Sequence, residues 1–506
     1  MIDGIAIVLQ TGLTDALFEA AISVFTPRIF GFMILGCLLG IFFGALPGIG
    51  ASLGMALVLP LTIALPPSVA LIFLICIYSG AMYGGSIAAI LINAPGTAPA
   101  AATTFDGYPM SRNGESLTAL AISATGSAIG GFITITLLIL LSPFLIEFIL
   151  LFGSPEYFLI AFLGIVMITV VAKGAMLKGL FAGAMGLLLS TVGMAPMSID
   201  HRYTFGSFEL FDGINFVAVL IGLFAIAEMI KLSGQKGGIS QATELSGSVI
   251  EGIRYVISKP ILVIKSSLIG MGIGAIPGAG ATVSNFIAYS EAVRSSSDPD
   301  SFGSGNKDGV LASESSNNGT IAGSIIPTIA FGIPGSAATA VFLGGLILHG
   351  LRPGPALFDE ELATTYAFLI ALLVSSFIIL TVGLLVVTRA SYITQIDTTY
   401  IIPTIFVLSY AGAYALRVSW VDIITVFVLG VIGYFMVKHN YSVIAFVLGV
   451  ILGPIAEQNL YRSLQLSQGS WDIFINEPLP AILTLMIVVI LIGPYLKPLA
   501  ERVTNL

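Results

Sequence analysis

The stretch that decides the fold reads Gly44-Ala-Leu-Pro47-Gly48-Ile-Gly50-Ala51-Ser52, and it recurs as Gly274-Ala-Ile-Pro277-Gly278-Ala-Gly280-Ala281-Thr282. Each copy lies in a long apolar run, because no charged residue occurs within 29–105 or 266–290. Proline removes a backbone donor and clashes with the preceding turn, whereas glycine permits the conformations needed to leave and re-enter a helix. The sequence therefore predicts a helix broken at the same point in two halves of the chain.

A second pair of matching motifs follows the first pair in the same order. Asn93-Ala-Pro95-Gly96-Thr97-Ala98 corresponds to Gly332-Ile-Pro334-Gly335-Ser336-Ala337. One such motif alone is as consistent with an ordinary kink as with a site, because Gly and Pro are tolerated in membrane helices. Several motifs in matched order indicate a duplicated unit.

The composition is that of a membrane protein. Hydrophobic residues make up 57% of the 506 residues and charged residues 9%, too few charges to cover the surface of a water-soluble protein of this size. A helix that spans the membrane needs about 20 predominantly apolar residues, and many charge-free stretches approach or exceed that length. We expect on the order of ten to twelve membrane crossings.

A polar segment divides the chain. Residues 231–259 form the least hydrophobic long stretch and carry a cluster of basic residues, which the positive-inside rule places in the cytoplasm. The predicted organisation is an N-terminal interfacial or first membrane segment (1–28), a first transmembrane repeat half (29–230), a cytoplasmic linker (231–259) and a second transmembrane repeat half (260–506). The expected fold class is an all-α polytopic membrane protein whose two repeated, inverted halves form a midplane site from discontinuous helices.

The predicted breaks offer groups that bind anions. Backbone groups freed at a break must face protein or a wet cavity, because each would cost several kcal/mol in lipid. A half-helix that begins at a break presents its amino end, which favours negative charge. The candidate substrate-binding residues are Gly48, Gly50, Ser52, Asn93, Gly96, Thr97, Gly278, Gly280, Thr282, Asn285, Asn317, Asn318, Gly335 and Ser336.

The same breaks offer carbonyl oxygens from the half-helices that end there. Hard oxygen ligands suit a small hard cation, so one architecture can hold both an anion and its driving ion. The candidate cation ligands, through backbone carbonyls, are Gly44, Ala45, Pro47, Gly274, Ala275 and Pro277. Glu314 either lies at the membrane interface or holds the substrate-binding groups in position without touching the substrate.

Several chemistries are disfavoured by what the sequence lacks. It contains no Gly-x-x-x-x-Gly-Lys-Ser/Thr phosphate loop, and its three histidines are scattered rather than grouped as zinc ligands. No general base stands at a recognisable spacing from any Ser. We therefore expect no catalytic residue, no enzymatic activity, no cofactor and no nucleic-acid partner.

Four motifs strongly resemble the large membrane subunit, TctA, of the tripartite tricarboxylate transporters. They are the repeated Gly-x-x-Pro-Gly-x-Gly, Tyr83-Gly-Gly-Ser-Ile-Ala-Ala-Ile-Leu-Ile-Asn-Ala-Pro-Gly96, Phe105-Asp-Gly-Tyr-Pro109 and Glu314-Ser-Ser-Asn-Asn318. The resemblance implies a sodium-coupled importer of citrate-like di- or tricarboxylates in the bacterial inner membrane, working with a small four-helix membrane subunit and a periplasmic substrate-binding protein. It also implies an elevator-like motion. Thr97 stands where the family often carries Glu, which leaves the particular carboxylate open.

Energetics favours a coupling cation, since importing an anion against an inside-negative potential costs about 2.3 kcal/mol per charge per 100 mV. The alternatives are a substrate-gated anion channel, which needs a continuous polar or charged pore lining, and an intramembrane hydrolase. A purely structural scaffold is a further alternative, but it would leave the matched breaks unexplained.

Overall fold

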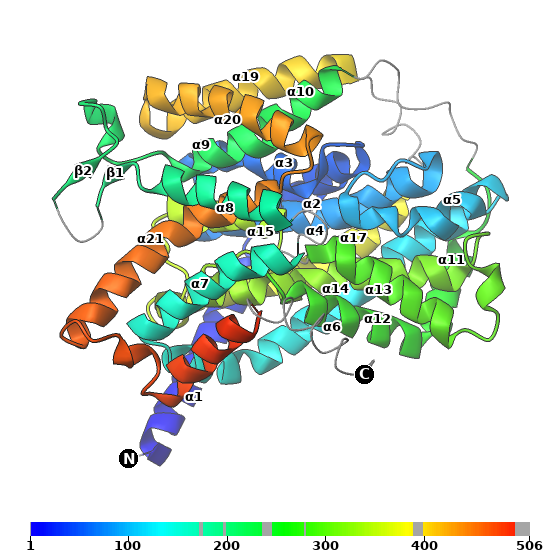
Figure 1. The fold of residues 1–506 in the computed structure, drawn as a ribbon. Helices are drawn as coiled ribbons and strands as arrows, with labels where there is room; N and C mark the ends of the chain where they lie inside the picture. Colours follow the sequence, from blue (N-terminus) through cyan, green and yellow to red (C-terminus); the bar gives the residue numbers. More distant parts are fainter. Residues whose placement is uncertain are drawn as a thin grey trace, which may run out of the picture.

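The protein is almost entirely helical in a computed structural model, which describes residues 2–171, 176–195, 199–234, 245–277, 280–387 and 398–490. Most helices run roughly along one common direction, with the small β1–β2 hairpin at one end of the molecule and α5 and α11 at the other (Figure 1). The expectation of a helical, polytopic membrane protein is confirmed.

The elements up to the polar segment are α1 (Ile2–Val24), α2 (Pro27–Ala45), α3 (Gly50–Val58), η1 (Leu59–Ala64), α4 (Pro67–Ile92), η2 (Ala98–Ala101), α5 (Thr104–Arg112), α6 (Ser116–Leu150), α7 (Ser154–Val171), α8 (Met176–Ser190), β1 (Gly193–Met194), β2 (His201–Arg202), η3 (Phe208–Leu210), α9 (Phe216–Leu220), η4 (Ile221–Ile226) and α10 (Ala227–Ser233). Strands β1 and β2 pair antiparallel. The η4 segment is a π-helical turn between α9 and α10, so these three form one continuous helical rod.

The later elements are α11 (Val249–Ser258), α12 (Pro260–Gly274), α13 (Gly280–Ser295), η5 (Pro299–Ser301), α14 (Lys307–Phe331), α15 (Ala337–Leu348), α16 (Pro355–Phe358), α17 (Leu362–Val387), α19 (Thr398–Arg417), α20 (Trp420–Lys438), α21 (Val443–Leu466) and η6 (Trp471–Phe474). A further apolar helix lies at Pro478–Ile490.

The described residues contain fewer helices of membrane-spanning length than the number of crossings expected from the sequence. In the described part of the chain, seven helices are long and apolar enough to cross a membrane, or eight if the pair α11–α12, bent by 80°, counts as one span. The expected ten to twelve crossings came from uninterrupted charge-free stretches. Several of those stretches fold instead as shorter apolar helices, among them α3 with η1, α8 and α15.

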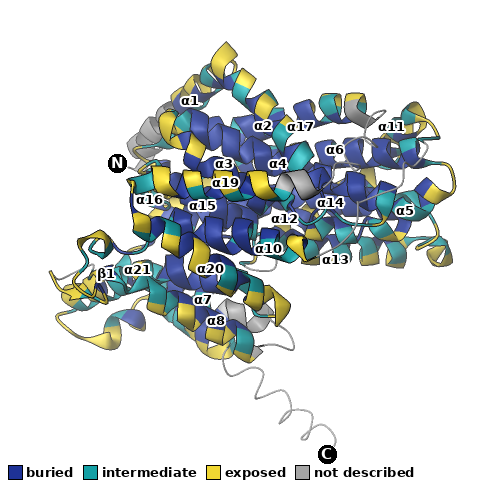
Figure 2. Cartoon of the chain, turned by 90° about the horizontal axis from the view of Figure 1, so that it is seen from above, coloured by how far each residue is buried: buried dark blue, intermediate teal, exposed yellow. Residues whose placement is uncertain are grey.

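Helix α4 lies at the centre of the molecule. The most apolar part of α4 is buried throughout, whereas the corresponding part of α6 is one-third buried. Figure 2 shows α4 and α14 within the buried interior, with exposed residues on α1 and on the flanks of α7, α8 and α20. A helix that is apolar on every side is expected to be surrounded by protein, and α4 meets that expectation.

Glycines let α2 approach α4 at backbone distance. A Cβ atom on Gly40 would lie 2.3 Å from the Ile77 carbonyl oxygen, and one on Gly44 would lie 2.3 Å from that of Ala81. From α4, a Cβ on Gly84 would lie 2.4 Å from the Ile41 carbonyl oxygen. Residue numbers at these contacts rise in the same direction along both helices, so α2 and α4 run parallel.

The same contact joins α12 to α14. A Cβ atom on Gly270 would lie 2.4 Å from the Ser316 carbonyl oxygen, and one on Gly274 would lie 2.6 Å from that of Thr320. These two helices therefore also run parallel. Small residues at a membrane helix interface allow such close approach, and packing rather than water exclusion then holds the helices together.

Helices α4 and α14 cross in opposite directions. Asn317 Nδ2 donates a hydrogen bond to the Met82 carbonyl at 2.8 Å, and Asn318 Nδ2 lies 3.5 Å from the Ser79 carbonyl. One turn earlier on α14, Glu314 receives a hydrogen bond from Ser86. Residue numbers rise along one helix as they fall along the other, so the pairs α2–α4 and α12–α14 are antiparallel to each other.

Replacing Gly270 by Ala is expected to destabilise the protein by about 1–3 kcal/mol, because the added methyl group overlaps the backbone of α14. Thermal unfolding of the detergent-solubilised protein measures the effect. Gly272→Ala on the same helix is the matched control, since nothing lies within 4 Å of its Cβ position. That variant is expected to keep or raise stability, because Ala favours helix over Gly. Equal melting temperatures for the two variants would contradict the packing described here.

Candidate functional site

The breaks in both halves meet at one cavity of about 490 Å³, referred to below as the central cavity. It is lined from four breaks and from three further helices, α4, α10 and α21. The lining residues are Gly48, Ile49, Gly50, Ala51, Ser52, Tyr78, Met82, Pro95, Gly96, Thr97, Ala98, Pro99, Glu228, Lys231, Gly280, Ala281, Thr282, Ser336, Ala337, Ala338 and Ile444. Segments separated by more than 200 residues therefore contribute to one space.

The first break opens the amino end of α3 to this cavity. Helix α2 ends at Ala45, and α3 begins at Gly50. Gly48 and Gly50 have φ angles of +84° and +64°, which glycine adopts without steric cost. The residue before α3, Ile49, provides no side-chain cap. Because the first amides of a helix lack intrahelical partners, the first turn of α3 offers donors toward the cavity.

The second break folds back onto the first. Helix α4 ends at Ile92, and Asn93 then takes a left-handed conformation with φ of 55°. The chain returns so that the Gly96 amide donates to the Gly85 carbonyl at 3.1 Å. A Cβ on Gly96 would lie 1.8 Å from the Gly44 carbonyl oxygen, so no other residue fits there. This contact places Thr97 at the cavity wall.

Thr97 is buried, and its hydroxyl has no hydrogen-bond partner among the described residues. The sequence predicted a half-helix directly after Gly96, but the structure has the four-residue η2 there, followed by α5 from Thr104. Pro99 lies in the first turn of η2 and cannot donate a hydrogen bond.

In the second half, α14 ends at a left-handed glycine, Gly332, and the chain again folds back. A Cβ on Gly335 would lie 2.8 Å from the Gly274 carbonyl oxygen, the counterpart of the contact between Gly96 and Gly44. Ser336 then begins α15 and forms a capping box with Thr339. Its hydroxyl thus serves its own helix, although Ser336 also lines the central cavity and lies 3.4 Å from the Tyr78 hydroxyl.

Eight of the predicted substrate-binding residues line the central cavity: Gly48, Gly50, Ser52, Gly96, Thr97, Gly280, Thr282 and Ser336. Five others do not line it, namely Asn93, Asn285, Asn317, Asn318 and Gly335. Gly278 lies outside the described residues. The structure brings most of the predicted set together, and the role of each in binding stays a prediction.

The amides predicted at the site make contacts between helices. Asn317 and Asn318 join α14 to α4 through their Nδ2 atoms, and their Oδ1 atoms are buried without a partner in the described chain. Asn285 on α13 donates to the carbonyl of Pro99, a cavity-lining residue, at 3.1 Å. These residues support the walls of the central cavity rather than forming its surface.

None of the six predicted cation ligands lines the central cavity. The carbonyl oxygens of Gly44 and Gly274 lie against Gly96 and Gly335, behind the cavity wall. No group of three or more His, Cys, Asp or Glu side chains suited to a metal ion occurs in the described residues. The backbone cation site stays a prediction.

Among the cavity-lining residues that sequence reasoning missed, three have polar or charged side chains. Tyr78 lies in the buried middle of α4. Glu228 and Lys231 lie on α10 and form an ion pair at 2.7 Å. Lys231 was assigned to the cytoplasmic linker, but α10 continues to Ser233. The available signal was the i, i+3 spacing of opposite charges at the end of an apolar helix.

A buried carboxylate joins the two halves behind the cavity. Glu314 on α14 is fully buried and accepts hydrogen bonds from four hydroxyls. The donors are Ser86 on α4 at 2.6 Å, Ser123 and Ser127 on α6 at 3.0 and 2.9 Å, and Thr103 before α5. These hydrogen bonds offset the cost of burying the polar carboxyl group away from water.

Asp106 makes a second buried contact between the halves. Its Oδ1 accepts from the backbone amides of Gly303, Gly305 and Asn306 at 2.8–2.9 Å, and its Oδ2 accepts from the Tyr289 hydroxyl at 2.9 Å. The Phe105–Pro109 motif therefore fixes the loop that leads into α14.

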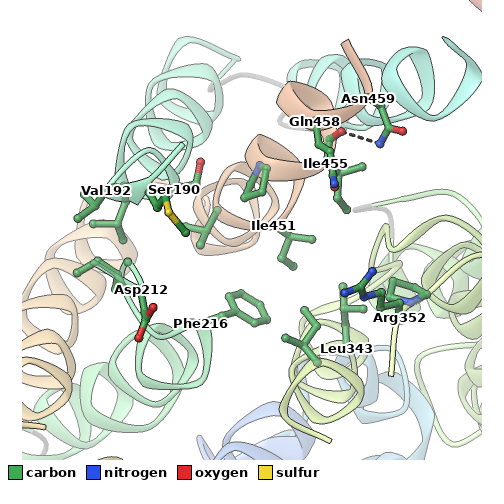
Figure 3. A pocket seen from close by; sticks show the side chains of 18 of the residues that line it. Ser190, Val192, Asp212, Phe216, Leu343, Arg352, Ile451, Ile455, Gln458 and Asn459 are labelled. Carbon is green, nitrogen blue, oxygen red and sulfur yellow. Dashed lines mark hydrogen bonds between the residues drawn. The ribbon is translucent and has the colours of Figure 1, made fainter. Parts of the chain in front are cut away.

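A second cavity, of about 710 Å³, lies beside the β1–β2 hairpin and is lined by none of the predicted site residues. Figure 3 shows Arg352 and Asp212 on different walls, with apolar residues such as Phe216, Leu343 and Ile451 between them. Asn459 donates to the Ile455 carbonyl at 2.8 Å within its α21 wall. The central cavity, where the breaks converge, is the stronger candidate site.

The family model described as "Tripartite tricarboxylate transporter TctA family" matches residues 30–448. The chain belongs to this family. It is thus a multi-pass membrane subunit of a tripartite transporter, which implies further subunits and a role other than that of an enzyme.

This TctA-family chain is similar to two proteins of Agrobacterium vitis. It is 34% identical over 493 residues to an "Uncharacterized 52.8 kDa protein in TAR-I ttuC' 3'region", covering 96% of this chain and 97% of the relative. It is 27% identical over 237 residues to an "Uncharacterized protein in TAR-II ttuC' 3'region", covering 46% of this chain and 98% of that relative. No solved structure matches the chain.

Replacing Glu314 by Leu is expected to lower the free energy of unfolding by about 3 kcal/mol, because four buried hydroxyls lose their shared acceptor. Glu251→Leu is the control, since Glu251 is about half exposed and pairs with Lys307 at the surface. Its loss is expected to cost less than about 1 kcal/mol. Thermal or denaturant unfolding in detergent measures both, and similar losses would show that the Glu314 cluster does not stabilise the protein.

Proposed function

We propose that this chain is the translocating subunit of a secondary transporter that imports citrate-like di- or tricarboxylates together with a coupling cation. The observation that carries the proposal is the convergence of the helix breaks on one cavity. Irregular backbone inside a membrane protein is tolerated where it faces protein or lines a cavity, and secondary transporters bind substrate at such places.

The lining of the central cavity supports an anionic substrate. Helices α3 and α13 both begin there, at Gly50 and Gly280, and helix amino ends favour negative charge. Ser52, Thr97 and Thr282 line the same walls, and the hydroxyl of Thr97 is turned toward Gly85 of α4. We propose that the predicted residues lining the cavity contact the carboxylate groups. Asn93, Asn285, Asn317, Asn318 and Gly335 do not line the cavity and would act on it through the residues that form its walls.

We further propose that the two halves, 29–230 and 260–506, are inverted repeats joined by a linker at 231–259. The glycine contacts support this, because Gly44 and Gly96 correspond to Gly274 and Gly335 in both sequence and packing. The opposite directions of α4 and α14 support an inverted relation. In such transporters one unit moves against another around the site, and we propose an elevator-like motion here.

A coupling cation follows from energetics. A dianion imported at 100 mV, inside negative, opposes the potential by about 4.6 kcal/mol, twice the cost for one charge. At least two monovalent cations make the transported complex neutral. We propose Na⁺, held by backbone carbonyls at the two matched breaks, with Gly44, Ala45, Pro47, Gly274, Ala275 and Pro277 as ligands.

The proposed assembly has two partners besides the bilayer. Membership in a family of tripartite transporters implies further subunits. We propose that these are a small four-helix membrane protein and a periplasmic substrate-binding protein, and that the complex lies in a bacterial inner membrane.

The function is tested by reconstituting the complete complex in proteoliposomes and measuring uptake of radiolabelled citrate and succinate. The account expects saturable accumulation that requires both the binding protein and an inward Na⁺ gradient. A K⁺ gradient of equal size is the control for osmotic and ionic effects.

Two results would count against the proposal. If uptake does not depend on the Na⁺ gradient, the proposed sodium coupling is wrong, although the proposed transport still stands. Conductance that does not saturate with substrate would instead favour an anion channel.

A further inference from the structure

Two charged side chains line the central cavity, Glu228 and Lys231, both on α10. Lys231 Nζ donates to Glu228 Oε1 at 2.7 Å. Their spacing of three residues places them on one face of the helix. Met229 and Leu232 on the same helix are buried, so α10 is packed against the protein at the position of the pair.

The pair lies against the first break. Glu228 Oε1 is 3.2 Å from the position of a Cβ on Gly48, and the Leu232 side chain is 3.0 Å from the same position. Gly48 leads into α3, whose uncapped first turn lines the cavity. The Lys231 ammonium is therefore close to the first backbone amides of α3, which are proposed to bind the substrate.

The Lys231 ammonium has capacity for a further partner. An ammonium group carries three donors, and a single contact to Glu228 is described for it. The lysine side chain is 42% exposed and the glutamate 19%, so the lysine is the more accessible member of the pair. An incoming carboxylate can reach the ammonium without breaking its contact with Glu228.

We propose that Lys231 is the cation that binds a carboxylate group of the substrate in the central cavity, with Glu228 holding its ammonium toward that cavity. This rests on the proposed function and adds the charged residue that selects anionic substrates. A charged contact acts more strongly on a substrate of higher negative charge, so Lys231 favours di- and tricarboxylates over monocarboxylates.

The test measures KM for citrate, succinate and acetate uptake by the complete complex in proteoliposomes. Lys231→Gln is expected to raise KM for citrate and succinate by about 10- to 100-fold, the loss typical of a charged hydrogen bond, and to affect acetate less. Lys231→Arg keeps the charge and is expected to retain most of the affinity.

Lys259→Gln is the matched control. Lys259 pairs with Asp308 at 3.0 Å, and the exposures of that pair, 41% and 20%, nearly equal those of Lys231 and Glu228. It does not line the central cavity. Its KM values are expected to match those of the wild type.

A double variant, Glu228→Gln with Lys231→Gln, distinguishes substrate binding by Lys231 from stabilisation of α10 by the ion pair. It removes both charges and keeps side chains that hydrogen bond at the same spacing. The proposal expects KM for citrate to stay high, because no cation remains. Recovery of the wild-type KM would show that the ion pair only supports α10 and would overturn the proposal.

The outcomes separate this inference from the function on which it rests. If the wild-type complex accumulates no carboxylate, the transport proposal fails and the role of Lys231 fails with it. If the wild type transports and Lys231→Gln behaves like Lys259→Gln, the role of Lys231 alone is wrong.

Discussion

Backbone contact at glycine is the interaction on which the rest of the structure depends. The Gly44 carbonyl lies against Gly96, and the Gly274 carbonyl lies against Gly335. Each contact fixes the end of one broken helix against the turn that follows a second helix. A side chain at Gly96 or Gly335 would separate the two breaks, and the central cavity would lose its shape. Close packing is the available driving force, since lipid gives apolar helices no hydrophobic reason to associate.

The positions of the breaks could be predicted because proline and glycine act locally. Pro47 and Gly48 dictate the end of α2 whatever surrounds them. The left-handed turns at Asn93 and Gly332 each come two residues before a Pro-Gly motif. The expected number of crossings exceeds the number of long apolar helices in the described residues for a related reason. A charge-free run has the same composition whether it crosses the membrane once or is divided into shorter helices.

Tertiary contacts decided what the sequence left uncertain. Lys231 was placed in a linker because polar residues follow it, yet α10 continues past it and packs against the first break. Asn317 and Asn318, which the sequence predicts to bind substrate, hydrogen bond to carbonyls of α4. Their partners lie more than 200 residues away, and no local pattern identifies such partners. Glu314 likewise draws its four donors from three separate segments.

The central claim is that the broken helices of both halves form one carboxylate site, and substrate protection of single cysteines tests it most directly. Ser52→Cys and Thr282→Cys place a thiol on α3 and α13 at the cavity wall, and Ser290→Cys places one on the exposed face of α13. The native Cys37 and Cys76 are buried and give little background labelling. The account predicts that citrate slows maleimide labelling at positions 52 and 282 and leaves position 290 unchanged. Equal labelling rates with and without citrate at positions 52 and 282, in a complex that transports citrate, would contradict it.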